Sequence, residues 1–195
     1  MNTTNTSAVA TKIMVIRHAE KANTQAVPKQ HGININGEKD DESLIPRGWQ
    51  RAGALVNFFA PRSGSCVTHI TTPQYLLAAD PGKDDQHSER PEETITPLSQ
   101  QLVLDIDTSF HKKDFATMVT AAKQQNGIIL IAWQHQDIPE IGNAIMGDQT
   151  SVPQKWPGNR FDIVWVFDLD KTSGKYKFTQ VTQQLLPGDT ANPIS

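Results

Sequence analysis

The stretch Ile13-Met14-Val15-Ile16-Arg17-His18-Ala19-Glu20-Lys21 is an apolar run that stops at an arginine and a histidine. Its apolar part has no polar alternation, which predicts a short strand buried on both faces, as in a parallel sheet. Ligands of open α/β sheets bind at the carboxyl ends of the strands, so Arg17 and His18 are predicted to stand at the rim of such a crevice. A guanidinium binds phosphate and an imidazole can act as a nucleophile, so the stretch favours phosphoryl chemistry. The alternative is that these polar residues merely end a strand.

The same layout recurs at residues 128–133, a buried-strand pattern that runs directly into Gln134-His135-Gln136-Asp137. If the two strands are neighbours, His18 and His135 come together, with Arg17 beside the first and Arg90 at a nearby helix start. Such a set can hold a tetrahedral phosphoryl group while one imidazole attacks phosphorus. Taken alone, a histidine such as His135 is more often structural than functional.

Periodicity and composition predict the remaining elements. Helices are predicted at residues 44–59, 91–102, 115–123 and 138–146, the last with Asp137 as its N-cap. Further strands are predicted at residues 67–72, 161–169 and 176–181, the last two forming a hairpin, and long loops at residues 22–43 and 78–89. This order predicts a three-layer α/β/α sandwich whose sheet is mainly parallel with an antiparallel edge hairpin.

The length of 195 residues fits one domain, with residues 1–10 as a flexible tail and the chain after Leu186 loosely held. Eighteen Lys and Arg against 21 Asp and Glu give a net charge of −3 without any basic block, which argues against nucleic acid and anionic membranes as partners. The single Cys66 cannot form an internal disulfide. No secretory signal or long apolar segment is visible, so we expect a soluble, cytoplasmic protein.

Over residues 12–145, the chain resembles the histidine phosphatase superfamily in the order of its motifs. This superfamily includes phosphoglycerate mutases and bacterial phosphohistidine phosphatases. That family opens with a strand and Arg-His-Gly, and Arg17-His18-Ala19 stands in this place. Residues 44–52, Leu-Ile-Pro-Arg-Gly-Trp-Gln-Arg-Ala, are similar to the family's Leu-Thr-Pro-x-Gly-x-x-Gln-Ala. Ala19 in place of glycine requires only that the backbone there not adopt a positive φ.

The family's second arginine usually lies in Ser-Pro-x-x-Arg-Ala-x-Gln-Thr. Thr72-Pro73 and Arg90-Pro91-Glu92-Glu93-Thr94 look like its two halves, separated here by an insertion. The family's second histidine ends a buried strand, as His135 does.

The resemblance implies a metal-independent phosphatase with no cofactor, acting on a small phosphorylated substrate or a phosphoprotein. His18 would be the phosphorylated nucleophile, while Arg17, Arg90 and His135 hold the equatorial oxygens of the phosphoryl group. A carboxylic acid would protonate the leaving oxygen, and the same carboxyl group would then activate water.

Branches of the family take this acid from a Glu between the second arginine and second histidine, or from an Asp directly after that histidine. We predict Asp137 as the acid because it is anchored to a strand end, with Asp105, Asp107 and Glu20 as alternatives. His87, three residues before Arg90, could also line the pocket.

Three functional interpretations stay open at this point. The first is hydrolysis of a phosphomonoester or phosphohistidine. The second is a catalytically idle member of the fold that binds a phosphorylated partner, and the third is a phosphoglycerate-type mutase. Any oligomeric state is compatible with the sequence.

Overall fold

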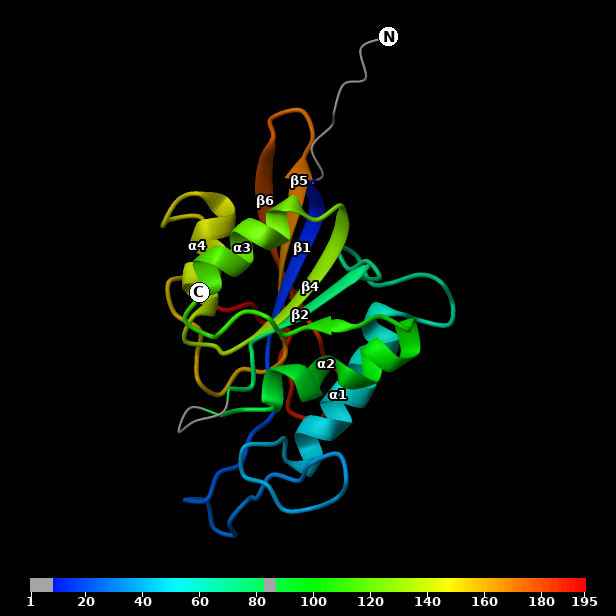
Figure 1. Cartoon of the computed structure of the whole chain (residues 1–195), viewed down its shortest axis with the longest axis vertical. Helices are drawn as coiled ribbons and strands as arrows, with labels where there is room; N and C mark the ends of the chain where they lie inside the picture. Colours follow the sequence, from blue (N-terminus) through cyan, green and yellow to red (C-terminus); the bar gives the residue numbers. More distant parts are fainter. Residues whose placement is uncertain (1–8, 83–86) are drawn as a thin grey trace.

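The structure, a computed structural model, describes residues 9–82 and 87–195 (Figure 1). One six-stranded sheet has the order β3-β2-β4-β1-β5-β6. The strands are β1 Ala10–Arg17, β2 Tyr75–Ala78, β3 Ile106–Asp107, β4 Gly127–Trp133, β5 Ile163–Asp170 and β6 Lys175–Thr182. The helices are α1 Pro46–Phe59, α2 Arg90–Leu102, α3 Phe115–Gln124 and α4 Ile138–Met146. Strands β3, β2, β4 and β1 pair in parallel and β1, β5 and β6 antiparallel, which confirms the predicted sheet.

The two faces of the sheet are covered by different helix pairs, α1 with α2 and α3 with α4 (Figure 1). Side chains of a strand alternate between faces, so β1 serves both layers. Ile13 and Val15 belong to the core beneath α3 and α4, whereas Met14 and Ile16 belong to the core beneath α1 and α2. All four are fully buried, so the predicted three-layer sandwich is confirmed and β1 lies at its centre.

Helix α4 packs directly on the sheet at Gly142. A Cβ added there would lie 2.9 Å from Cζ3 of Trp165 and 3.1 Å from Cγ2 of Val152. We expect Gly142→Ala to overpack this contact and to lower the free energy of unfolding by about 1–3 kcal/mol, measured by urea denaturation. The control is Gly53→Ala on α1, where a Cβ meets nothing within 4 Å, so no loss of stability is expected. A Gly142→Ala protein as stable as the wild type would contradict this packing.

The strand predicted at residues 67–72 is wrong. His69 has a φ of +69°, which a strand does not tolerate, and of these six residues only Ile70 is buried. The strand of this region is β2, which pairs with β4 and buries Leu76, Leu77 and Ala78. Burial against β4 thus outweighs the β-branched composition of residues 67–72.

Both predicted tails need correction. Ala10 is fully buried as the first residue of β1, so the tail cannot extend to residue 10, and residues 1–8 lie outside the described part. After Leu186, the Asp189 carboxylate accepts hydrogen bonds of 2.8 and 3.0 Å from Arg51, and Ile194 is buried. The chain end is therefore held by an ion pair and a core contact that its polar composition does not reveal.

The loop predicted at residues 22–43 contains no named helix or strand and is fixed at several points. Trp49 Nε1 donates to the Ile33 carbonyl at 2.7 Å, and the Leu44 amide donates to the Glu93 carboxylate at 2.8 Å. The second loop starts one residue later than predicted, since Ala78 still belongs to β2, and residues 83–86 are outside the described part. Within the described ranges, no helix is both long and apolar enough to cross a membrane.

Candidate active site

The two histidine-bearing strand ends meet at one edge of the sheet. Strands β1 and β4 are parallel neighbours with Arg17 opposite Trp133, and the His18 amide donates to the Trp133 carbonyl at 2.9 Å. His18 and His135 consequently line the same cavity of about 270 Å³, together with Arg90. The sequence prediction that these three residues come together agrees with this geometry.

His18 is a buried, neutral imidazole. Its ring Nδ1 lies 2.7 Å from the Ala19 carbonyl, which can only accept, so Nδ1 carries the proton and Nε2 keeps a lone pair. Burial, followed by the charge of Arg17, lowers the pKa of His18 well below 6.5. The Ala19 amide donates to Thr94 Oγ1 at 2.8 Å, and the Ala19 methyl is fully buried. Ala19 is absent from the positive-φ residues, so alanine is compatible with this backbone.

Arg17 lies behind His18, outside the set of residues that line the cavity. Its Nη1 donates to the Gly158 carbonyl at 2.7 Å and the Arg160 carbonyl at 3.1 Å, and its Cζ lies 3.8 Å from the centre of the Phe161 ring. Burial lowers its pKa to about 10, a value at which the guanidinium is still charged at neutral pH. Nε of Arg17 is buried without a partner in the described part of the chain, so the group retains donor capacity.

Arg90 is the first residue of α2 and borders the cavity from the other side. Its Nη2 donates to the Asp41 carbonyl at 2.7 Å and to Glu42 Oε2 at 2.9 Å. Its buried Nε has no partner among the described residues. Arg90 therefore has two donors that an anion could use. Nε has no partner among the described residues, and Nη2 is bonded to the Glu42 carboxylate.

His135 follows β4 and faces residue 158, where an added Cβ would lie 3.8 Å from His135 Nε2. Burial, followed by the charges of Arg17 and Lys21, lowers its pKa to about 4. Its Nδ1 is buried without a partner within the described ranges. This neutral ring has a free polar atom in a cationic environment, as expected of a group that receives a ligand.

We expect the two site histidines to stay neutral at mildly acidic pH. In an imidazole ¹⁵N NMR titration, His135 should titrate near 4 and His18 well below 6.5. His87 should titrate above 6.5, because its Nδ1 donates to the Gly82 carbonyl at 2.7 Å and Glu89 lies beside it. As pH falls below 6.5, the unfolded chain binds protons at His18 and His135 that the folded protein excludes, so their contribution to stability decreases. Titration of both site histidines near 6.5 would contradict the burial described above.

Additional polar groups complete the cavity wall. Lys21 lines it, and burial followed by the charges of Arg90 and Arg17 lowers the pKa of this ammonium group. His87 also lines it, in agreement with the possibility raised by its position in the sequence. The carboxyl groups that line it are Glu42 and Asp80.

The carboxyl groups singled out from the sequence lie elsewhere. Asp137 precedes α4 as predicted but makes no capping bond, since its carboxylate accepts the Gln134 side-chain amide, and it does not line the cavity. Asp105 and Asp107 line a separate cavity with Tyr75, at the start of β2. The Glu20 carboxylate is held by Arg51 at 2.8 Å and by Arg47 at 3.1 Å, and Glu20 does not line the cavity that contains His18.

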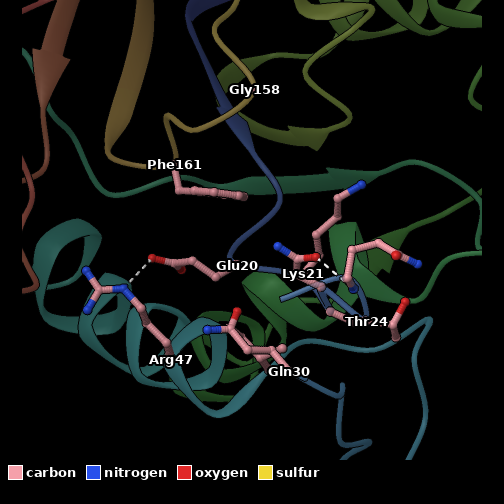
Figure 2. Close-up of a pocket in the computed structure, with 11 residues that line it drawn as sticks. Glu20, Lys21, Thr24, Gln30, Arg47, Gly158 and Phe161 are labelled. Atoms are coloured by element: carbon pink, nitrogen blue, oxygen red, sulfur yellow. Dashed lines mark hydrogen bonds and ion pairs between the residues drawn. The ribbon is translucent and has the colours of Figure 1, made fainter. Parts of the chain in front are cut away.

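A second cavity of about 540 Å³ lies under the loop that follows β1. Figure 2 shows Phe161 on one wall and Gln30 opposite, with the Glu20–Arg47 ion pair at one end and Lys21 and Thr24 at the other. Lys21 lines both this cavity and the one that holds His18, so the two adjoin. Its volume is typical of sites for small organic ligands.

Comparisons with known proteins place the fold. No protein-family model matches the sequence, and no curated protein matches it. A mutant phosphoserine phosphatase from Entamoeba histolytica, in complex with phosphoserine, aligns at 12% identity and TM-score 0.55 over 91% of this chain and 99% of that chain. The alpha-ribazole phosphatase from Shigella flexneri aligns at 12% identity and TM-score 0.54 over 92% and 99%.

The protein histidine phosphatase SixA, complexed with tungstate, aligns at 11% identity and TM-score 0.51 over 88% of this chain and 97% of that chain. The chain therefore has the histidine phosphatase fold, as the resemblance of its motifs predicted.

Some residues of this site were missed by the sequence analysis. Strand β2 ends at Ala78, so Asp80-Pro81, two residues later, rather than Thr72-Pro73, lies after the strand that precedes Arg90. The segment between Asp80-Pro81 and Arg90 is shorter than the segment between Thr72-Pro73 and Arg90. This shorter spacing is the signal that could have indicated Asp80-Pro81. Gly158 and Phe161, which hold Arg17, lie in a loop without a motif.

Proposed function

We propose that this chain is a metal-independent phosphatase that hydrolyses a phosphomonoester through a phosphohistidine on His18. The observation that carries the proposal is the state of His18, whose Nδ1 is committed to the Ala19 carbonyl and whose neutral Nε2 is available beside Arg90 and His135. A neutral imidazole fixed in one tautomer is the nucleophile that phosphoryl transfer requires. The phosphatases that share the fold are consistent with this activity.

The surrounding charges suit a dianionic phosphoryl group. Arg90 contributes its unpartnered Nε and, once Glu42 is displaced, its Nη2. His135 contributes its ring from the neighbouring strand end, and Arg17 contributes the charge of a guanidinium fixed under Phe161. Such fixed donors stabilise the transition state without reorganisation.

The reaction is a double displacement. His18 Nε2 forms a bond to phosphorus while the bond to the leaving oxygen breaks, and a carboxyl group gives that oxygen a proton. Water then attacks phosphorus, the P–N bond breaks, and inorganic phosphate leaves. The larger cavity that adjoins at Lys21 is the proposed place of the organic part of the substrate. In residues 9–82 and 87–195, no group of three or more His, Cys, Asp or Glu could hold a metal ion.

Hydrolysis of p-nitrophenyl phosphate in the presence of a chelator tests this function. We expect turnover that tungstate inhibits competitively. Tungstate binding without turnover at any pH would contradict the phosphatase and favour a phospho-ligand-binding member of the fold.

A further inference from the structure

The positions of the carboxyl groups limit which residues can give a proton to the leaving oxygen. Within the described part of the chain, Glu42 and Asp80 are the carboxyl groups that line the cavity containing His18. A general acid must come within hydrogen-bond reach of the substrate. Among the described residues, the comparison is therefore between these two.

Glu42 is bound to the group that is proposed to receive the substrate. Its Oε2 lies 2.9 Å from Arg90 Nη2, and its side chain is 47% exposed at the end of the loop over the cavity. The carboxylate oxygen thus occupies a position on Arg90 that an equatorial phosphoryl oxygen takes in the mechanism above. Glu42 and a bound phosphoryl group compete for the same donor.

This competition favours the substrate. Half-exposed ion pairs are weak, whereas a phosphoryl group can accept two charge-assisted hydrogen bonds from one guanidinium. The unpartnered Nε of Arg90 is available for the second bond. Binding of the phosphoryl group at both donors would therefore displace the Glu42 carboxylate from Arg90 while leaving Glu42 at the cavity wall.

Asp80 is placed for a different task. Its Oδ1 accepts the Gly82 amide at 3.0 Å, and its own amide donates to the Phe110 carbonyl at 2.9 Å. Both bonds fix the turn after β2. The Asp80 carboxylate therefore already has a structural role in this turn.

We propose that Glu42 is the catalytic acid. Its carboxyl group leaves Arg90 when the substrate binds, and it then gives a proton to the leaving oxygen. This assignment rests on the proposed phosphatase function. As the His18 Nε2–phosphorus bond forms and the phosphorus–oxygen bond breaks, the Glu42 carboxyl proton moves to the leaving oxygen. In the second step the Glu42 carboxylate accepts a proton from the attacking water, and it gives up that proton to solvent when phosphate leaves and the ion pair with Arg90 forms again.

The test is the dependence of kcat/KM on the leaving group for Glu42→Gln. An acid matters little when the leaving group is p-nitrophenolate and much when it is an alkoxide. We expect kcat/KM to fall less than about threefold for p-nitrophenyl phosphate and about 10²–10⁴-fold for an alkyl phosphate. Glu38→Gln is the matched control, because Glu38 lies in the same loop, bonds Asn34 and does not line the cavity. It should retain both wild-type values.

A rapid-mixing experiment with p-nitrophenyl phosphate gives a second readout. Because Glu42 also serves as the base for water, Glu42→Gln should release a burst of p-nitrophenol and accumulate phosphorylated enzyme. Equal losses on all substrates, or a gain in activity, would overturn the assignment. So would a leaving-group-dependent loss in Asp137→Asn. Wild-type protein that turns over neither substrate would instead contradict the phosphatase itself, and the assignment with it.

Discussion

Replacement of His18 by alanine is expected to lower kcat for p-nitrophenyl phosphate by at least about 10⁴-fold, because the proposed mechanism gives the bond to phosphorus to His18 Nε2. His18 is the buried imidazole whose Nε2 is free beside Arg90. The loss should be of kcat rather than of affinity, since Arg90 and His135 remain to bind the anion. Steady-state kinetics with tungstate inhibition separates the two effects.

The matched control for this variant is His69→Ala. His69 is exposed, and its carbonyl accepts Lys12 Nζ at 2.6 Å near the start of β1, at the opposite end of the strand from His18. Its activity should equal that of the wild type. A His18→Ala protein that is folded, binds tungstate and retains more than about a tenth of wild-type kcat would exclude His18 as the nucleophile.

Replacement of Arg90 by alanine is the second large effect. Arg90 is a cation that borders the cavity, and its buried Nε has no partner among the described residues, so its removal should lower kcat/KM by about 10²–10³-fold. The tungstate inhibition constant should rise in parallel, because the same donors bind the ground-state anion. Stopped assays over a range of tungstate concentrations measure both quantities.

Two further variants make the Arg90 prediction specific. Arg90→Lys keeps the charge but not the planar fork, so it should recover only part of the loss. Arg62→Ala removes an exposed arginine that lies beyond the end of α1 and should change neither quantity. Equal activity of Arg90→Ala and Arg62→Ala would show that Arg90 has no part in anion binding.

The core of the fold and the meeting of His18 with His135 could be predicted from the sequence because both depend on local patterns. Residues 13–16 and 128–133 are uninterrupted apolar runs, and runs of this kind become central parallel strands. Each run ends in a histidine, and parallel neighbours bring those ends to the same edge. Periodicity likewise predicted α4 at its observed bounds.

The errors arise where contacts between distant segments decide the outcome. Strand β2 has four residues without β-branching, and its pairing with β4 makes it a strand. The end of the chain is held by Asp189 on Arg51, residues 138 positions apart in the sequence. Glu42 comes to Arg90 across 48 positions, which no motif in its loop indicates. Side-chain proximity of this kind follows from the folded topology, so the contact that motivates the proposal of Glu42 could not be predicted from strand ends alone.

The most direct test of the proposed activity is mass spectrometry of the enzyme mixed with p-nitrophenyl phosphate and quenched in alkali, where phosphohistidine survives. We predict one added phosphoryl group on the peptide that contains His18, in an amount that rises in Glu42→Gln and disappears in His18→Ala. Turnover with no phosphorylated peptide, or with the phosphoryl group on another residue, would contradict the account.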